Sequence, residues 1–330
     1  MTAPDPALLN RLHGVPLAVW GHAVLDRYLY GVTDRISREA PVLIVKEESE
    51  ACFLGGAGNT AANLVGLGAQ AYLVSPVGRD PESDRLARLC ADTGIPDTGL
   101  IRSALASTTT KTRILAGGLH TTRQQMLRID RESEAPLERA ALRAFERAAL
   151  DTLDHVRGVI VSDYGAGTLT PLLRTLGQEA QSRGLPVVVD SRRGILEFSG
   201  MTAVTPNAPE AEAALGRRLR STDDAVSAAC ELRERLELES ALLTRGREGM
   251  VLATAGKPPL VVPAEGGDAV DVTGAGDTVV ATFSTGLAAG LGPRDSALLA
   301  NQAASIVVQK TGTAPIADAE LRALLTEPNQ

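Results

Sequence analysis

The sequence predicts an α/β protein whose mostly parallel sheet is covered by helices on both faces. Short apolar runs rich in β-branched residues recur along the chain, and stretches of helical periodicity separate them. Strands buried on both faces of a parallel sheet read as such continuous apolar runs, and crossover helices connect them. The chain has 330 residues, 44% of them hydrophobic, so it can bury a large core without disulfide bonds or a structural metal.

The first predicted strand, Val15–Trp20, is an apolar run without alternation, which favours a central position in the sheet. The first predicted helix, Asn59–Leu67, follows a glycine-rich turn. Further along, Leu137–Leu150 has the apolar spacing of three and four positions that is typical of an amphipathic helix. The remaining predicted strands are Ala71–Val77, Gly158–Val161, Pro186–Val189 and Ala241–Leu243, and the remaining predicted helices are Leu169–Arg183, Thr222–Leu236 and Val279–Ala289.

Two stretches interrupt the alternation of strands and helices, at about residues 28–50 and 106–131. Both contain Thr, Val and Ile with interspersed charges, a composition typical of extended hairpins. We expect them to form a small β-strand lid at the carboxyl edge of the main sheet, where open α/β sheets bind ligands. The alternative is a pair of surface hairpins with no part in function.

The composition excludes several classes of protein. Acidic side chains outnumber basic ones by 40 to 33, a net charge of −7, whereas a nucleic-acid partner needs clustered positive charge. No apolar run approaches the roughly 20 residues that cross a bilayer, so we expect no membrane partner. The cysteines Cys52, Cys90 and Cys230 form no CxxC pair, which is typical of a reduced cytoplasmic protein.

The strongest functional signal is Asp271–Thr278, with the sequence DVTGAGDT, followed by an apolar helix. Gly274 and Gly276 leave backbone N–H groups accessible at a helix start, where the helix dipole favours an anion such as a transferring phosphoryl group. Beside a phosphate, Asp277 suits the task of accepting the proton of an attacking hydroxyl. The alternative is an aspartate that only caps a helix after a glycine turn.

A second glycine cluster, Gly55–Gly58, precedes Asn59 and another predicted helix. Bare backbone and amide side chains suit the recognition of a substrate with many hydroxyl groups. The cluster also matches a loose dinucleotide-binding fingerprint, but that fingerprint belongs in the first βα turn, which follows Val15–Gly21 here. Gly256-Lys257 lacks the spacing and the Ser or Thr of a Walker A motif. A kinase, if this is one, is therefore of another design.

In this order the motifs point to a family. Over essentially its whole length the chain resembles the ribokinase-like (phosphofructokinase-B type) carbohydrate kinases, through Gly55-Gly56, Asn207-Ala208-Pro209-Glu210, Thr244-Arg245-Gly246 and Asp271–Asp277. Within that family it is most similar to kinases that phosphorylate D-glycero-β-D-manno-heptose 7-phosphate at O1, a step toward ADP-heptose and the lipopolysaccharide core. This similarity rests on Leu25–Tyr28, Arg35–Ser37, Glu39–Val42, Thr109–Arg113 and Gln124–Asp130.

The resemblance implies a three-layer α/β/α fold in one kinase domain over residues 1–330, with ATP and Mg²⁺ as cofactors. It implies Asp277 as the catalytic base, with an anion hole formed by Gly274, Ala275 and Gly276. The residues expected to hold the sugar are Asp26, Gly55, Gly56 and Asn59. Those expected around the nucleotide are Asp163, Asp190, Asn207, Glu210, Thr244, Gly246 and Asn301, with Glu210 holding Mg²⁺ in part through water. Asp271 and the loop Val308–Gly312 form an expected site for a monovalent cation such as K⁺.

The basic residues favour a phosphorylated sugar on separate physical grounds. Lysine occurs only four times, and two of the four, Lys46 and Lys111, fall in the predicted lid. We expect Lys111, Arg113 and Arg128 to neutralise a distal phosphate; the alternative is that these cations are solvated strand edges. The chain departs from the heptose kinases at several positions; in particular, His22 stands where they carry Asp, and Asp190-Ser191-Arg192-Arg193 where they carry Asp-Pro-Lys-Gly.

Several functions stay open on the sequence alone. The same fold serves kinases for fructose, ribose, ketodeoxygluconate or nucleosides, and it could also carry a non-catalytic sugar or nucleotide sensor. A dinucleotide-dependent oxidoreductase is a more distant alternative. We expect a homodimer formed through the lid strands, because pairing of two lids would cover their unpaired edges.

Overall fold

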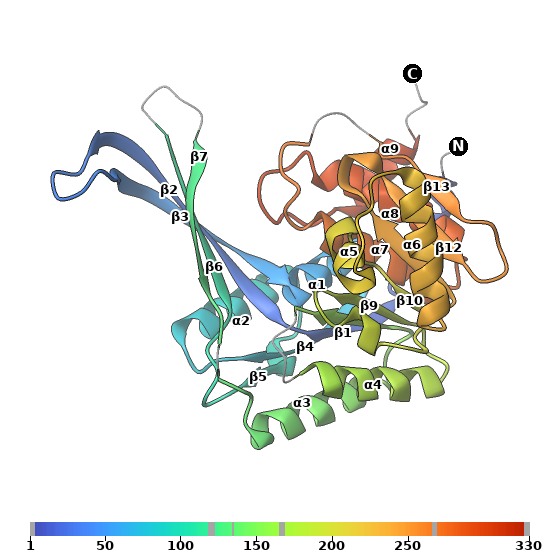
Figure 1. Cartoon of the computed structure of the whole chain (residues 1–330). Coiled ribbons are helices and arrows are strands. Elements are labelled where there is room, and N and C mark those ends of the chain that lie inside the picture. The colour runs from blue at the N-terminus through green and yellow to red at the C-terminus, as the bar shows by residue number, and fades with distance from the viewer. Residues whose placement is uncertain (1–3, 118–122, 134, 165–168, 266–268, 327–330) are drawn as a thin grey trace.

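The described residues form two β-sheets, a large one at the centre of the molecule and a smaller one that projects from it (Figure 1). The computed structural model describes residues 4–117, 123–133, 135–164, 169–265 and 269–326. The strands are β1 (Pro16–Gly21), β2 (Ala23–Ile36), β3 (Leu43–Gly56), β4 (Gln70–Val77), β5 (Leu100–Arg102), β6 (Thr110–Gly117), β7 (Gln124–Arg131), β8 (Val159–Asp163), β9 (Val187–Ser191), β10 (Ala203–Val204), β11 (Ser240–Thr244), β12 (Met250–Thr254) and β13 (Leu260–Val262). The helices are α1 (Ala57–Gly66), α2 (Pro81–Thr93), α3 (Arg139–Thr152), α4 (Thr170–Ser182), α5 (Ala208–Leu215), α6 (Thr222–Arg235), α7 (Ala275–Ala288), α8 (Pro293–Val307) and α9 (Asp318–Thr326).

The large sheet has the strand order β13-β12-β11-β10-β9-β8-β1-β4-β5. Neighbouring strands from β11 to β5 pair in parallel, whereas β12 and β13 are antiparallel additions at one edge. The predicted α/β class with a mostly parallel sheet is therefore confirmed. The antiparallel edge does not follow from the apolar runs, because direction is set by the connections and not by side-chain pattern.

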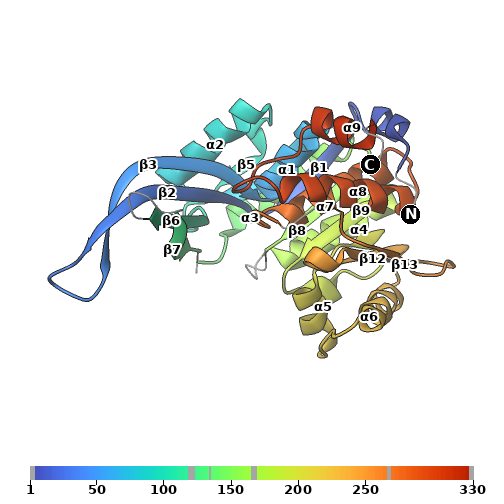
Figure 2. The same cartoon turned by 90° about the horizontal axis from the view of Figure 1, so that it is seen from above.

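Alternate residues of β1 divide the core into two layers around this sheet. Leu17 and Val19 lie in a cluster with apolar residues of α1, α7 and α8, whereas Ala18 and Trp20 face the opposite side and pack against α3 and α4. The indole of Trp20 is fully buried and donates to Thr152 Oγ1 at 3.2 Å, which satisfies its polar atom. A third cluster packs α5 and α6 against β11 and β12. Helices thus cover both faces of the sheet (Figures 1 and 2).

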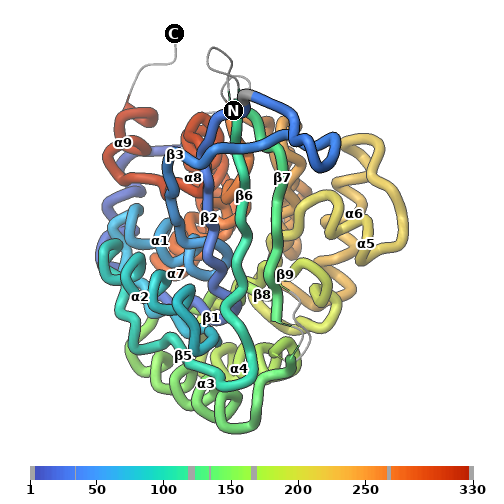
Figure 3. Tube along the Cα trace, turned by 90° about the vertical axis from the view of Figure 1, so that its left-hand side faces the viewer, coloured from blue at the N-terminus to red at the C-terminus, as the bar shows by residue number. Residues whose placement is uncertain are grey.

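The smaller sheet, which we call the lid, has the order β3-β2-β6-β7 and is drawn facing the viewer in Figure 3. Its strands pair antiparallel except β2 with β6. The two predicted extended segments are confirmed as strand pairs, β2 with β3 and β6 with β7; residues 37–42 and 106–109 are not strand, and residues 118–122 lie outside the described part of the chain. The lid is longer than predicted, because pairing of β2 with β3 continues to Ala23 and Gly56. Asp26 and Gly55 therefore lie within lid strands and not in a turn.

The sequence patterns locate most central elements to within a few residues but miss the helices α2, α5, α8 and α9 and the strands β5, β10, β12 and β13. The signals that start and end α2 are nevertheless present. Asp80 caps the helix by accepting from the Ser83 backbone N–H, Pro81 occupies the first turn, and Gly94 ends it with φ of 82°. Capping chemistry thus identifies a helix whose apolar face is too narrow to be read as a periodic stretch.

Candidate active site

The site lies at the carboxyl ends of β1, β8 and β9, beneath the lid. β1 pairs with β4 on one side and β8 on the other, so the chain reverses its direction of travel through the sheet at β1. Open α/β sheets bind ligands in the crevice at such a reversal. The motif that contains Asp277 reaches this crevice from the first turn of α7.

Gly274 and Asn59 together set the position of Asp277. Gly274 precedes α7 with φ of 82°, a left-handed conformation that favours glycine, and a Cβ there would lie 2.7 Å from Asn59 Nδ2. The amide of Asn59 can therefore lie against the start of α7, where its Nδ2 donates to Asp277 Oδ2 at 2.7 Å. Asn63, one turn further along α1, accepts from Thr278 Oγ1 at 2.8 Å. The two helices that meet at the site are thus joined by side-chain hydrogen bonds.

The carboxyl group of Asp277 is buried yet well supplied with donors. Besides Asn59, the hydroxyl of Tyr164 donates to Asp277 Oδ1 at 3.0 Å, and Thr60 Oγ1 lies 3.5 Å from the same oxygen. Burial raises the pKa of Asp277 to about 6, and the hydrogen bonds from Asn59 and Tyr164 oppose that rise. A carboxylate with a pKa near neutrality is suited to accept a proton from a hydroxyl.

The three residues predicted to form an anion hole, Gly274, Ala275 and Gly276, lie at the start of α7. The backbone N–H of Ala275 donates to the carbonyl of Val272 at 3.3 Å. A Cβ on Gly276 would meet no heavy atom within 4 Å, so the backbone at Gly276 borders open space next to Asp277. The positive end of the helix dipole also points there, which favours an anion.

The residues expected to hold the sugar come from the lid and from α1: Asp26 lies on β2, Gly55 and Gly56 end β3, and Asn59 lies on α1. A Cβ on Gly55 would lie 2.3 Å from Asp26 Oδ2, so glycine at this position makes room for the carboxylate. Asp26 is buried and forms an ion pair with Arg113, which lies two residues beyond its cross-strand neighbour Lys111. Asn59, as described, contacts Asp277. In this structure the polar atoms of Asp26 and Asn59 thus face protein partners.

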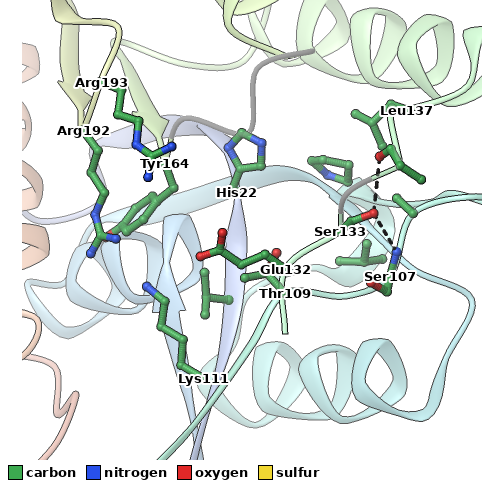
Figure 4. A pocket seen from close by; sticks show the side chains of 15 residues that line it. His22, Ser107, Thr109, Lys111, Glu132, Ser133, Leu137, Tyr164, Arg192 and Arg193 are labelled. Carbon is green, nitrogen blue, oxygen red and sulfur yellow. Dashed lines mark hydrogen bonds between the residues drawn. The ribbon is translucent and has the colours of Figure 1, made fainter. Parts of the chain in front are cut away.

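A cavity of about 140 Å³ opens between the lid and the sheet beside Tyr164 (Figure 4). Lys111 of the lid points into it from one side, and Arg192 and Arg193, which follow β9, approach it from another. The pKa of Lys111 is lowered by burial and next by the charge of Arg192. The lining holds three cationic side chains and one carboxylate, that of Glu132, so the net charge of the cavity favours the binding of an anion. The lining residues are His22, Val24, Pro76, Val77, Ala106, Ser107, Thr109, Lys111, Glu132, Ser133, Ala135, Leu137, Tyr164, Arg192 and Arg193.

The cations of this cavity differ from the predicted set. Lys111 lines it, but Arg113 is paired with Asp26, and Arg128 donates from Nε and Nη2 to Asp130 at 2.8 Å. Arg192 and Arg193 take their place. The signal for them is the replacement of Pro-Lys-Gly by Ser-Arg-Arg after Asp190.

Two further residues, His22 and Tyr164, also line the cavity. The side chain of His22 is 12% exposed, its Nδ1 lies 4.0 Å from Asp163 Oδ1, and burial lowers its pKa while the charge of Asp163 opposes the change. The sequence patterns do not predict Tyr164, because a single tyrosine after a strand carries no motif. Its ring lies against the cavity while its hydroxyl contacts Asp277.

Carboxylates gather at the ends of β8 and β9. Asp163 Oδ2 accepts from Thr170 Oγ1 at 3.1 Å and Ser191 Oγ at 3.0 Å. Burial raises the pKa of Asp190 well above its usual range, and the charges of Glu210 and Asp277 add to that rise. Such mutual repulsion would be relieved by a divalent cation. No described group of three or more His, Cys, Asp or Glu side chains is arranged as a direct metal cage, so the residues suit an ion held largely through water and phosphate.

The other residues expected around the nucleotide lie on neighbouring loops. Asn207 and Glu210 form a capping box at the start of α5, in which each accepts from the other's backbone N–H at 2.9 Å. Asn207 also forms a β-bridge with Thr244, and Gly246 follows two residues later with open space around it. Asn301 is separate from this group, because it is buried in α8 and donates to the carbonyl of Pro263 at 3.0 Å.

At the expected monovalent-cation site, backbone hydrogen bonds connect Asp271 with the loop Val308–Gly312. Asp271 Oδ1 accepts from the Thr273 backbone N–H and Oδ2 from that of Gly312, both at 2.9 Å. The carbonyl of Val308 accepts from the backbone N–H of Val270 and of Asp271. The structure thus brings Asp271 and the loop Val308–Gly312 together. Carbonyl and carboxylate oxygens are ligands suited to a hard cation.

A buried carboxylate at a glycine-rich helix start, a cationic cavity beside it and a β-sheet lid define an enzyme of the ribokinase-like class, which transfers phosphate to an alcohol group. Residues 16–320 match the model of the pfkB family carbohydrate kinases. The chain belongs to this family.

Individual relatives and solved structures agree with that placement. The chain is 42% identical over 311 residues to the bifunctional protein HldE of Caulobacter sp. strain K31, covering 93% of this chain and 62% of the relative. It is 38% identical over 321 residues to HldE of Pelobacter propionicus, covering 96% and 64%. The chain thus spans less than two thirds of the length of these curated relatives.

Solved structures show the same fold at low sequence identity. Phosphofructokinase-2 from Escherichia coli, in complex with potassium, superposes with a TM-score of 0.77 at 20% identity, over 95% of this chain and 100% of that one. Ribokinase of Arabidopsis thaliana, complexed with ribose and ATP, gives 0.73 at 19% identity, over 96% and 100%. None of the described helices has the length and apolar character needed to span a bilayer.

Proposed function

We propose that the chain is an ATP-dependent kinase for a sugar phosphate, D-glycero-β-D-manno-heptose 7-phosphate, and that it phosphorylates O1 within a single domain formed by the core and the lid. The observation that carries the proposal is the cationic cavity of Lys111, Arg192 and Arg193 beside the buried Asp277. A sugar with a free hydroxyl at one end and a phosphate at the other is complementary to this arrangement: the phosphate would bind in the cationic cavity, and the hydroxyl would face Asp277. The similarity to HldE supports this choice of sugar.

In the proposed mechanism, Asp277 accepts the proton of the attacking hydroxyl. The hydroxyl oxygen forms a bond to the γ-phosphorus of ATP, and the bond between that phosphorus and the β–γ bridging oxygen breaks to release ADP. Asn59 and Tyr164 hold the two oxygens of Asp277, so one lone pair can point at the hydroxyl. The start of α7 stabilises negative charge that develops on the transferring group.

Mg²⁺ fits the carboxylate cluster near Glu210 and would neutralise charge on the nucleotide phosphates. A monovalent cation such as K⁺ would lie in the loop of Asp271 and Gly312 and stabilise the carbonyls that precede α7. The lid covers the sugar and excludes water, which limits loss of the γ-phosphate by hydrolysis.

The proposal also includes a homodimer formed through the lid. Leu29, Ile114 and Leu127 are register partners across β2, β6 and β7, so they share the face of the lid that is opposite to Lys111. Leu127 and its neighbour on the same face, Ile129, are 53% and 52% exposed. A second copy of the same apolar face would cover this stripe and the unpaired edge of β7.

An assay of ADP release over a panel of sugars tests the proposed function. The panel contains the heptose with and without its 7-phosphate, together with fructose, ribose, ketodeoxygluconate and a nucleoside. We expect kcat/KM for the heptose 7-phosphate to exceed every other value by at least about tenfold, the scale of one charge-assisted contact. Preference for an unphosphorylated sugar would refute the heptose phosphate assignment, and binding without ADP release would indicate a sensor.

A further inference from the structure

Tyr164 connects the two ends of the site. It directly follows β8, and its hydroxyl donates to Asp277 Oδ1 at 3.0 Å. Burial and the nearby charge of Asp277 raise the pKa of Tyr164 well above its usual range, so the hydroxyl stays protonated and remains a donor. One oxygen of the base is therefore held by a side chain whose ring lies at the cationic cavity.

Lys111 and Arg192, the two cations suited to bind an anion, both lie close to the ring of Tyr164. The guanidinium carbon of Arg192 lies 4.6 Å from the ring centroid, and Lys111 Nζ lies 5.3 Å from it. Both distances are within the range of cation–π attraction. Figure 4 shows Tyr164 beside Arg192 on one side of the cavity, with Lys111 pointing toward the same space. Any shift of these two cations changes the electrostatic environment and packing of the ring.

The backbone makes room for this ring. Gly56 has φ of 56°, and a Cβ there would lie 3.2 Å from Tyr164 Cε2. Gly56 is also the last residue of β3, immediately before α1, the helix that carries Asn59. The glycine cluster read from the sequence as a sugar-binding turn thus also provides the space in which the ring of Tyr164 packs.

An anion in the cavity would act on the ring through both cations. Without it, Lys111 and Arg192 repel each other; burial is the main cause of the lowered pKa of Lys111, and the charge of Arg192 adds to it. A phosphate that accepts from both would hold them at fixed positions and so limit the movement of the ring that both lie close to. The hydroxyl would then be held at Asp277 Oδ1 by the occupied cavity.

We propose that Tyr164 is a positioning residue that couples an anion in the cavity of Lys111 and Arg192 to the orientation of Asp277. The inference rests on the proposed function, because it takes the distal phosphate of the sugar as that anion. The phosphate then raises kcat in addition to affinity, since binding energy at a remote group is used to orient the reacting groups.

The test compares Tyr164→Phe with the wild type on the heptose 7-phosphate and on the unphosphorylated heptose. We expect the variant to lose about tenfold or more in kcat on the phosphorylated sugar, the scale of a hydrogen bond to a charged group. Its KM for that sugar should change little, and its kcat on the unphosphorylated sugar should change much less. Tyr72→Phe, in β4 and outside the cavity, is the matched control and should retain wild-type kinetics.

The pH profile gives a readout that a purely structural role would not affect. The charged or titratable groups that act on Asp277 are Asp26, Tyr164, Asp190 and Arg192. Removal of the Tyr164 hydroxyl removes a donor to the carboxylate, so the acid limb of kcat should move to higher pH in Tyr164→Phe. Arg192→Gln leaves the hydroxyl in place but removes a cation from the ring, and it should lose the kcat advantage of the phosphorylated sugar.

The possible failures are distinguishable. If the wild type prefers an unphosphorylated sugar, the proposed function fails and the coupling fails with it. If the wild type prefers the heptose 7-phosphate but Tyr164→Phe slows both sugars equally, or leaves the acid limb unchanged, the coupling alone is refuted. Thermal unfolding of each variant shows whether it is folded; because Arg192→Gln keeps the tyrosine, it tests the coupling even if Tyr164→Phe is unstable.

Discussion

The burial of Asp277 has a measurable cost in stability, and its replacement by Asn tests the assignment of the base. An acid whose folded pKa lies above its unfolded pKa stays protonated in the folded state while the unfolded chain ionises. The pKa of Asp277 rises from 3.8 to about 6. At 1.36 kcal/mol per pKa unit, this carboxyl destabilises the fold by about 3 kcal/mol above pH 6 and by almost nothing below pH 3.8.

Asp277→Asn keeps the shape of the side chain and removes this titration. Its amide oxygen still accepts from Asn59, so the variant should be more stable than the wild type at pH 8 by up to about 3 kcal/mol. At pH 4 the difference should shrink to about 0.5 kcal/mol, because the folded wild-type carboxyl is then protonated and the unfolded one is only partly ionised. The turnover of the same variant should fall by about 10²–10⁴.

Chemical denaturation of both proteins at pH 4 and pH 8 measures the difference, since it reports the free energy of unfolding directly. Glu146→Gln, on the exposed face of α3, is the matched control and should change stability little at either pH. A stability difference between wild type and Asp277→Asn that is the same at pH 4 and pH 8 would refute the buried, titrating carboxylate. Near-normal turnover of the variant would refute its role as the base.

The other predictions concern the pH profile, the cavity, the glycine turn and the dimer. In the wild type, log kcat should decrease with unit slope below pH about 6, because Asp277 must be ionised to accept a proton; a flat profile down to pH 5 would contradict this. Lys111→Met should raise KM for the heptose 7-phosphate by about 10–100-fold, measured by ADP release, with little change for the unphosphorylated sugar. Gly274→Ala places a Cβ 2.7 Å from Asn59 Nδ2 at φ of 82°, so denaturation should show a loss of about 1–3 kcal/mol and the assay a lower kcat; unchanged values would show that the turn relaxes freely. Ile129→Glu should convert the dimer to a monomer in light scattering, and a wild type that is already monomeric at micromolar concentration would refute the lid interface.

Sequence patterns predict the fold class and the central motif because both depend on local information. The apolar run of β1 predicts a buried strand, and Gly274 predicts a turn before α7. Both structures can be predicted without knowledge of distant residues. The lid is different. Asp26 and Arg113 are separated by 87 positions, and whether they meet depends on the register of β2 against β6, which a run of Thr, Val and charged residues does not specify.

The same limit applies to polar side chains at the site. An asparagine near a glycine turn has the donors to hold a sugar hydroxyl or a protein carboxylate, and only the structure places Asn59 on Asp277. Tyr164 has neither a motif nor a charge to mark it. Its position emerges from three segments that meet in space, namely the end of β8, the end of β3 and the loop after β9.

The lid is continuous with α1, the helix that carries Asn59, and this continuity affects how variants can be interpreted. β3 ends at Gly56, α1 starts at Ala57, and the first turn of α1 carries Asn59 with its bond to Asp277. A rotation of the lid about its base would therefore also move Asn59, the residue whose amide donates to the carboxylate of Asp277. Steady-state kinetics of lid variants will combine changes in sugar affinity with changes in the chemical step, and single-turnover measurements are needed to separate the two.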